Sequence, residues 1–319
     1  MKAALMRGPW AIDVVDVEEP KPPPGWALVR VELAGICGTD KAFYTGSYKL
    51  LKTPLVPGHE AVGVVVEGPE GLVGARVVPE INFPCWSCEY CKAGLYTHCP
   101  SKKTLGIDFD GTMAEYFVAP PSALHLFPGS PERGVFVEPL AAVLRALSAR
   151  PLVPGARVAV IGTGNVAWLT VQVLRNACGV EVHLVAREGS VKARRYEGLV
   201  DRVVYVSEVP ASRYEAVFEV SGDSASLDLA IKAAKPRGVI YLKSTPGSLA
   251  LVNTTLAVVK EVEIVCTRCG TSREFQTAIE LLTSGVITPI LDKTYSLAEV
   301  KKAFDEALRP EYFKVAIRP

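Results

Sequence analysis

From Arg157 onward, short apolar strands alternate with helical patterns. The predicted strands are Arg157–Ile161, Val180–Ala186, Ala216–Val220, Gly238–Leu242 and Val262–Cys266, and the first predicted helix, Val166–Cys178, lies between two of them. A strand that returns to the same sheet through a helix runs parallel to its neighbour, and such crossovers are right-handed. This half of the chain therefore predicts an α/β domain with a parallel sheet.

The first 140 residues have a different pattern, in which short strands are separated by turns rich in Gly and Pro. Alternating or Val-rich runs at Ala27–Leu33, Ala61–Glu67 and Gly74–Pro79 predict an antiparallel, barrel-like β domain. A helix is predicted for Glu138–Arg150, because apolar residues recur at helical spacing and Pro151 follows. One more helix after Ser272 and a final strand at Lys314–Ile317 complete the prediction.

Length and charge limit the classes of partner. With 319 residues, the chain is long enough for two domains of roughly 150 residues each. The formal net charge of +1 offers no broad positive field to nucleic acid or to an anionic membrane. Met1–Trp10 lacks an apolar signal core and no apolar stretch approaches the roughly 18 residues of a membrane span, so we expect a cytoplasmic protein. The chain has only two Gln and four Asn, a shortage typical of heat-adapted proteins.

A glycine-containing turn follows the first strand of the second half. The strand leads directly into Gly162–Ala167 and then into a helix. Gly162 permits a tight turn, Gly164 lets a pyrophosphate approach the backbone, and the helix N-terminus offers free N–H groups to phosphate. We therefore predict a dinucleotide site with contacts from Gly162, Gly164, Asn165 and Val166. The alternative is a purely structural turn.

The end of the second strand predicts which dinucleotide binds. An acidic residue is expected there for NAD, because a carboxylate accepts bonds from the adenosine ribose hydroxyls. This chain has Ala186 and then Arg187, so no carboxylate repels a 2′-phosphate and a planar cation can pair with one. Ser190 lies near enough in sequence to help, as do Lys192, Arg194 and Arg195. We predict NADP(H) over NAD(H); the alternatives are a solvated basic face and Glu188 as a displaced ribose ligand.

Four of the eight cysteines form one compact cluster. Cys85, Cys88, Cys91 and Cys99 follow the spacing Cys-x2-Cys-x2-Cys-x7-Cys. Four thiolates on one loop suit a closed tetrahedral zinc site, which stabilises the fold but leaves no coordination position open for chemistry. An iron–sulfur cluster and disulfides are the alternatives, although the long last gap does not match a ferredoxin run. We predict a structural zinc site.

Two further segments flanked by glycine carry groups suited to catalysis. Gly35–Asp40 contains Cys37 and Thr39, and Gly58 precedes His59 and Glu60. A thiolate and an imidazole match the ligand types of an open zinc site, with Glu138 as a third candidate ligand and Asp40 as a residue that orients His59. Taken singly, Cys37 could be a small buried apolar residue and His59 an ordinary polar one.

Together, these motifs resemble the zinc-containing medium-chain alcohol dehydrogenase/reductase family, whose members include alcohol, polyol, glucose and threonine dehydrogenases. The resemblance spans the whole chain and rests on segments in family order, namely Gly35–Asp40, Gly58–Glu60, the four cysteines, Gly111–Tyr116, Glu138–Ala141 and the glycine turn. It implies a GroES-like β-rich catalytic domain (residues 1–140 and 269–319) and a doubly wound Rossmann cofactor domain (residues 141–268).

The resemblance also implies roles for single residues. Cys37, His59 and Glu138 would bind catalytic zinc, with Glu60 as an alternate ligand, and Thr39 would pass the alcohol proton towards the cofactor ribose. Thr245 and Lys314 join the predicted cofactor contacts. Members with a proton-relay histidine carry it five residues after the zinc-binding cysteine, where this chain has Ala42. The outer relay must then use water or another group.

The activity implied is hydride transfer between NADP(H) and a small alcohol–carbonyl pair, with zinc as Lewis acid. Aromatic residues near the motifs would suit a bulky or cyclic substrate, although aromatic residues more often serve packing (Phe43, Tyr44, Tyr48, Trp86 and Phe109). Glu138–Ala141 instead resembles polyol and sugar dehydrogenases. A zinc-free quinone or enoyl reductase and a non-enzymatic zinc-stabilised nucleotide-binding module are the alternatives. Family members pair through an edge strand that corresponds to Val262–Cys266, so we expect a homodimer or homotetramer.

Overall fold

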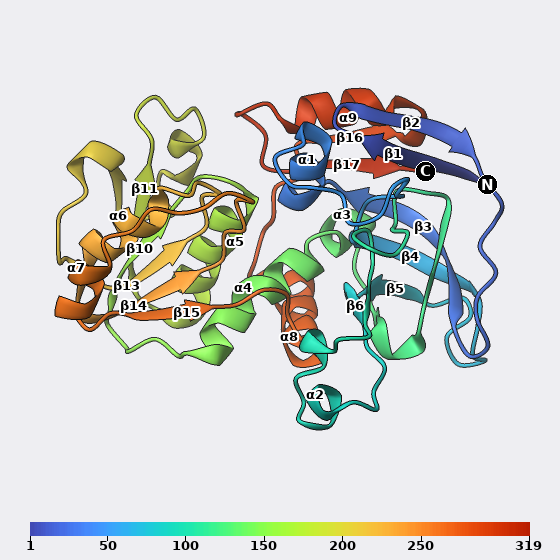
Figure 1. Ribbon diagram of the computed structural model, residues 1–319, viewed down its shortest axis with the longest axis horizontal. Coiled ribbons are helices and arrows are strands. Elements are labelled where there is room, and N and C mark those ends of the chain that lie inside the picture. The colour runs from blue at the N-terminus through green and yellow to red at the C-terminus, as the bar shows by residue number, and fades with distance from the viewer.

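The second half of the chain forms a six-stranded parallel sheet in the computed structural model, which comprises residues 1–319 (Figure 1). Its elements are β10 (Arg157–Ile161), α5 (Asn165–Val173), β11 (Glu181–Ala186), β12 (Arg202–Tyr205), β13 (Tyr214–Glu219), α6 (Ser226–Ala233), β14 (Ala234–Leu242), α7 (Thr254–Val259) and β15 (Glu263–Cys266). The strand order is β12-β11-β10-β13-β14-β15. The order reverses at β10, and in such sheets ligands bind at the carboxyl ends of the strands beside this switch point.

The remaining residues build a second body around a seven-stranded sheet, to which the chain returns after β15. Its elements are β1 (Lys2–Gly8), β2 (Ala11–Asp16), β3 (Ala27–Gly35), α1 (Gly38–Thr45), β4 (Glu60–Glu67), β5 (Arg76–Pro79), β6 (Asn82–Phe83), α2 (Glu89–Lys92), β7 (Lys103–Thr104), β8 (Tyr116–Ala119), β9 (Leu124–Leu126), α3 (Pro131–Gly134), α8 (Ser272–Thr283), β16 (Lys293–Ser296), α9 (Val300–Ala307) and β17 (Val315–Arg318). Helix α4 (Val137–Ala149) connects this body to β10 and packs against both α8 and α5. The order is β16-β17-β3-β4-β5-β9, with β8 paired to β3. All pairs in this sheet are antiparallel except β16 with β17.

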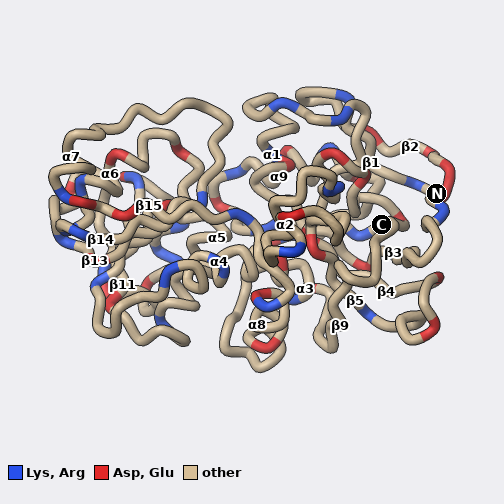
Figure 2. Tube along the Cα trace, turned by 60° about the horizontal axis from the view of Figure 1, so that its bottom comes forward, with Lys and Arg blue, Asp and Glu red and all other residues tan.

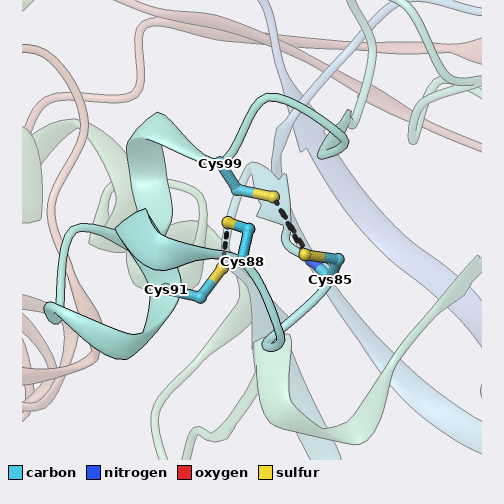
Figure 3. A group of neighbouring side chains, drawn as sticks. All are labelled: Cys85, Cys88, Cys91 and Cys99. Carbon is cyan, nitrogen blue, oxygen red and sulfur yellow. Dashed lines mark hydrogen bonds between the residues drawn. The ribbon is translucent and has the colours of Figure 1, made fainter.

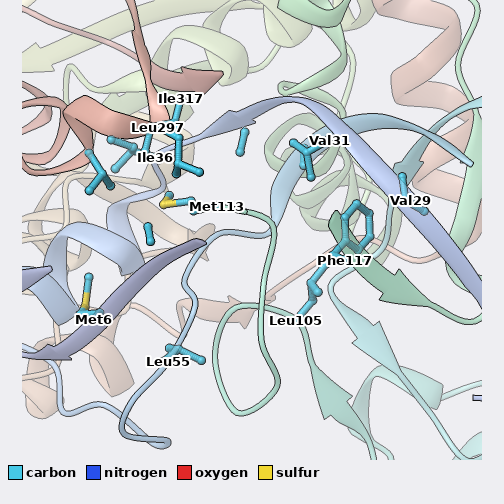
Figure 4. Packing of buried hydrophobic residues seen from close by; sticks show 14 of the residues in the cluster. Met6, Val29, Val31, Ile36, Leu55, Leu105, Met113, Phe117, Leu297 and Ile317 are labelled. Atoms are coloured by element: carbon cyan, nitrogen blue, oxygen red, sulfur yellow. The ribbon is translucent and has the colours of Figure 1, made fainter. Parts of the chain in front are cut away.

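Each sheet has its own hydrophobic core. The β-rich body buries a cluster of 28 residues, of which Met6, Val31, Leu105 and Phe117 are visible in Figure 4. A second cluster packs α4 against α8 and includes Leu169 and Val173 of α5, so it joins the two bodies. Burying apolar area of this kind is the main favourable term in folding. The metal and nucleotide motifs described below lie around this junction.

The α/β class, the parallel sheet and the barrel-like β body are confirmed, with differences at the level of elements. No helix was predicted near the glycine-flanked segment Gly35–Asp40, but residues 38–45 form helix α1, with Cys37 as its N-cap. The predicted helix over residues 166–178 begins at Asn165, ends at Val173 as an α-helix, and continues to Cys178 as a π-helical turn. Strands β1, β2, β12 and β16 and helix α9 were not predicted from the sequence either.

Charged residues of both signs are interspersed over the two bodies (Figure 2). Many form ion pairs on the surface, for example Arg76 with Glu32 and Arg175 with Asp201. None of the helices combines the length and the apolar character needed to cross a lipid bilayer.

Candidate active site

Three donor groups meet where β3, α1 and β4 come together. Cys37 lies between β3 and α1, and His59 immediately precedes Glu60, the first residue of β4. The antiparallel register pairs Gly35 with Glu60, so the end of β3 lies beside the start of β4. The ligand atoms of Cys37, His59 and Glu60 all lie within 4.8 Å of one another, and Nδ1 of His59 is buried without a hydrogen-bond partner. A thiolate, an imidazole and a carboxylate around one point fit a zinc ion.

Asp40 fixes the backbone of both loops that carry these donors. Its buried carboxylate accepts hydrogen bonds from the backbone N–H of Cys37 at 2.8 Å and from that of Gly58 at 3.2 Å. We expected Asp40 to orient the ring of His59. The structure instead gives it hydrogen bonds to the two backbones, and it acts on His59 through its charge.

Burial and neighbouring charges set the protonation of this cluster. Burial raises the pKa of the Cys37 thiol, and the nearby Glu60 carboxylate adds to that rise. For His59, burial alone would lower the pKa, but Cys37 and Asp40 outweigh it and raise the pKa well above its usual value. The thiol of Cys37 and the imidazole of His59 are therefore strongly coupled electrostatically, and metal binding by both groups would require them to release their protons.

Glu138 lies outside the group whose ligand atoms converge. It sits in the first turn of α4 and is buried, and burial raises the pKa of its carboxyl while the nearby His59 opposes that rise. The convergent carboxylate is Glu60, the alternate ligand of the sequence reading. Glu60 also forms a buried ion pair with Lys314, whose ammonium donates to the carbonyl of Ile36 as well. Lys314, which we predicted to contact the cofactor, is thus ion-paired with Glu60, a candidate metal ligand.

The glycine turn after β10 has the geometry expected of a phosphate site. Gly162 has φ +127° and packs so closely on the backbone of Ser221 that a Cβ would lie 2.9 Å from its Cα. Gly164 has no atom within 4 Å of where a Cβ would lie, which leaves room for a ligand. Asn165 is the first residue of α5, and both Nδ2 and Oδ1 of its side-chain amide are buried without hydrogen-bond partners. An unpaired buried amide and a free helix N-terminus suit a pyrophosphate.

The end of β11 carries the groups that the sequence singled out for cofactor choice. Ala186 is buried, and the exposed Arg187 forms an ion pair with Asp223 at 3.0 Å. Ser190 lies next to the glycine turn, where its hydroxyl donates to that of Thr163 at 3.3 Å. Val166 lies in the first turn of α5, and Thr245 is exposed beyond the end of β14.

Glu188, the alternative ribose ligand, forms hydrogen bonds with Ser207 instead. Its Oε1 accepts hydrogen bonds from the backbone N–H of Ser207 at 3.0 Å and from the Ser207 hydroxyl at 2.5 Å. These bonds lower the pKa of Glu188. The carboxylate is therefore held against the segment that follows β12.

The four clustered cysteines converge on one point of a small lobe around α2 (Figure 3). Their sulfur atoms lie within 4.8 Å of one another, with 3.5 Å between Cys88 and Cys91 and 3.5 Å between Cys85 and Cys99. A tetrahedron with zinc–sulfur bonds of about 2.3 Å has edges of about 3.8 Å. The spacing fits a closed four-thiolate zinc site.

The segment after β15 links this lobe to the nucleotide sheet, a role that nothing in the sequence pattern indicated. The ammonium of Lys243, just after β14, donates to both oxygens of Thr267 and to the carbonyl of Arg268. Burial lowers the pKa of Lys243 to about 8. From the other side, Arg268 donates to the carbonyl of Thr97, and Tyr96 accepts from the backbone N–H of Ser272 at 2.6 Å. Only tertiary contacts reveal these partners, because they come from segments far apart in the chain.

The aromatic residues that suggested a bulky substrate mostly serve other purposes. Phe43 and Tyr44 are fully buried members of the core of the β-rich body, and Tyr48 packs against Phe43. Trp86 packs on Tyr96 in the cysteine lobe, and Phe109 packs on Trp26 and Phe83. Their presence near the motifs therefore gives no argument for a bulky substrate.

Known proteins share both the sequence pattern and the fold. Residues 23–129 match the alcohol dehydrogenase GroES-like domain. The chain is 29% identical to an alcohol dehydrogenase of Geobacillus stearothermophilus, over 96% of this chain and 95% of that protein. A putative zinc-binding dehydrogenase from Sinorhizobium meliloti 1021 bound to NADP superimposes with a TM-score of 0.90 at 28% identity, covering 100% of this chain and 99% of that one. A thermostable alcohol dehydrogenase from Pyrobaculum aerophilum gives a TM-score of 0.91 at 28% identity and the same coverage.

A parallel nucleotide sheet, a GroES-like body and a cysteine–histidine site define a two-domain dehydrogenase. The motifs occur in family order along the whole chain, and the relatives match over nearly its full length. Over nearly its whole length the chain is similar to zinc-containing medium-chain dehydrogenases, among them alcohol, sorbitol and threonine dehydrogenases.

Proposed function

We propose that this protein catalyses zinc-dependent hydride transfer between a nicotinamide dinucleotide and an alcohol–carbonyl pair. The convergence of Cys37, His59 and Glu60 within 4.8 Å carries the proposal. The nucleotide body reaches this region, because Gly247, beyond β14, packs against the carbonyl of Ser47 just after α1. The segment after β14 thus lies against the end of α1, the helix that begins next to Cys37.

Each residue of the site has a separate task in this proposal. Bound zinc supplies a Lewis acid that polarises the substrate oxygen, and bound nicotinamide accepts or gives the hydride. Cys37 and His59 hold the metal, and Glu60 or Glu138 completes the protein ligands. The hydroxyl of Thr39, in the first turn of α1, accepts the proton of the substrate alcohol while it gives its own proton to the cofactor ribose or to water. Water passes that proton on to solvent, because Ala42 has no ionisable group.

Replacing the two central ligands tests the proposal. In Cys37→Ala and His59→Ala, we expect turnover to fall to background while the far-UV spectrum and the binding of NADPH stay near wild type. Metal analysis should show the loss of one zinc per chain. Cys266→Ala, which removes a thiol outside both clusters, is the control. Full turnover by a zinc-free variant would contradict the assignment.

We further propose that NADP(H) is preferred to NAD(H) and that the four-cysteine lobe binds a second, structural zinc. Ala186 leaves the end of β11 without a carboxylate, and Arg187 is exposed there. The cysteine sulfurs have the spacing of a four-thiolate zinc site. Two zincs per chain by metal analysis, and tighter binding of NADPH than of NADH, are the expected results.

We infer that residues 141–268 form the nucleotide domain, residues 1–140 and 269–319 form the catalytic domain, and β15 pairs with a second copy of the chain. All strands from β10 to β15 belong to the six-stranded sheet. β15 is an edge strand of this sheet, and the segment that leads to it from β14 exposes apolar side chains, with Leu249 98% and Leu251 91% exposed and Val258 and Val259 also exposed. Exposed apolar edges of this kind mark interaction surfaces.

The oligomer prediction is tested by a charged residue on this surface. We expect Val259→Glu to shift the mass measured by light scattering from an oligomer towards a monomer, because a buried unpaired charge opposes association. Val73→Glu, at an exposed position of the β-rich body, should leave the mass unchanged. A monomeric wild-type protein would contradict the proposal.

A further inference from the structure

A carboxylate reaches the cofactor-selecting end of β11 from a different strand. Asp223 follows β13, and its Oδ2 accepts a hydrogen bond from the Arg187 guanidinium at 3.0 Å. β10 lies between these two strands and pairs with both of them. The Arg187–Asp223 pair therefore spans the carboxyl end of β10, where the strand order reverses.

The turn that carries Asp223 is tightly defined. Asp223 Oδ1 accepts from the backbone N–H of Ala225 at 3.0 Å, and the Asp223 N–H donates to the hydroxyl of Ser221 at 3.0 Å. Ser221 packs directly on Gly162 of the glycine turn. These contacts fix the Asp223 carboxylate beside the glycine turn.

The segment that ends β11 offers no free carboxylate of its own. Ala186 has none, and Glu188 is bound to Ser207. A ribose hydroxyl and a 2′-phosphate make opposite demands here. The ribose hydroxyls of NAD donate hydrogen bonds to a carboxylate. The 2′-phosphate of NADP is repelled by a carboxylate, and it can pair with Arg187 only if the ion pair between Arg187 and Asp223 breaks.

We propose that Asp223 supplies, from across β10, the ribose-facing carboxylate that the end of β11 lacks, and that it thereby sets the selectivity between NADPH and NADH. The inference rests on the proposed dinucleotide-dependent function. In this arrangement Arg187 favours the 2′-phosphate and Asp223 opposes it, so the preference for NADPH is smaller than Arg187 alone would give.

The test is equilibrium binding of NADPH and NADH, followed by the fluorescence of the reduced nicotinamide, to the full-length protein. Asp223→Asn keeps the side-chain shape and an acceptor for Ala225 while removing the charge. We expect the ratio of the NADH to the NADPH dissociation constant to rise about five- to tenfold, since one unit charge is removed a few ångströms from the phosphate. The gain should shrink in the Arg187→Met background, where no guanidinium is released.

Glu215→Gln is the matched control, because it removes the same charge at the opposite end of β13, where Glu215 pairs with Lys235. An Asp223→Asn ratio equal to that of wild type and of Glu215→Gln would overturn the inference. A wild type that prefers NADH would contradict the proposed NADP(H) preference alone, and a rise of the ratio in Asp223→Asn would still support the role of Asp223. Absence of binding by either dinucleotide to wild type would overturn both.

Discussion

A single buried carboxylate, that of Asp40, accepts the backbone N–H groups of Cys37 and Gly58, one from each loop that carries candidate metal ligands. Neither N–H has a backbone partner in a helix or strand, because each lies just before an element begins. The loops are therefore held at a fixed separation by one side chain. Placement of the candidate metal ligands depends on a residue that is not itself among the convergent donors.

Removing that carboxylate should destabilise the fold. In Asp40→Ala both N–H groups lose their acceptor, at about 1–3 kcal/mol each, so we expect the free energy of unfolding to fall by about 2–6 kcal/mol. Denaturant titration measures the change. Asp40→Asn retains an acceptor and should lose less. Equal stability of Asp40→Ala and wild type would show that water replaces the carboxylate.

Acid stability should depend on Glu306 in α9. Hydrogen bonds from Lys293 and Arg309 lower the pKa of Glu306 to about 2. A lowered carboxyl pKa stabilises the folded state above the unfolded pKa of about 4.3, and this contribution is lost as the pH falls to about 2. Glu306→Gln should therefore melt below wild type at pH 7, with the difference vanishing near pH 2. A difference that persists at pH 2 would assign it to packing instead.

Loss of a cysteine from the four-cysteine lobe should lower the melting temperature of the protein more than it lowers turnover. In Cys85→Ala one of four convergent thiols is lost, and a closed site with three ligands holds zinc poorly. We expect a lower melting temperature together with the loss of one zinc per chain. Cys266→Ala should show neither effect. Lost turnover at an unchanged melting temperature would contradict this division between the two clusters.

At the scale of the whole molecule, the junction between the bodies is packed without spare room. Gly270 lies on the segment that enters α8, and a Cβ there would lie 2.7 Å from the Cβ of Ala141 and 2.9 Å from its backbone in α4. Because backbone atoms cannot move aside cheaply, Gly270→Ala should lower the free energy of unfolding by about 1–3 kcal/mol.

Gly71→Ala is the control for that substitution. A Cβ at Gly71 would have no atom within 4 Å, and the backbone there does not require glycine. Its melting temperature should match that of wild type. If Gly270→Ala also had the wild-type melting temperature, this result would contradict the prediction, because it would mean that α4 and α8 can move apart without loss of stability.

Elements with a strong local signal could be predicted from the sequence. Residues 158–161 are β-branched or small and lead into glycine, so the first nucleotide strand and its turn follow from local preference. α1 could not be predicted in this way, because its start has Gly38 and its apolar positions are few. It is stabilised by Phe43 and Tyr44 packing into the core, and by a hydrogen bond from Tyr44 to Asp305 in α9.

The two-body organisation and the glycine turn could be predicted from local patterns, and Cys37, His59 and the four clustered cysteines could be singled out, because periodicity and ligand spacing are local properties of a chain. The carboxylates that lie nearest to these groups can be identified only in the folded chain. Glu60 rather than Glu138 joins the convergent donors, and Asp223 rather than Glu188 faces Arg187. The physical reason is that strand register and strand order bring together residues that the chain separates, and no local pattern records that proximity.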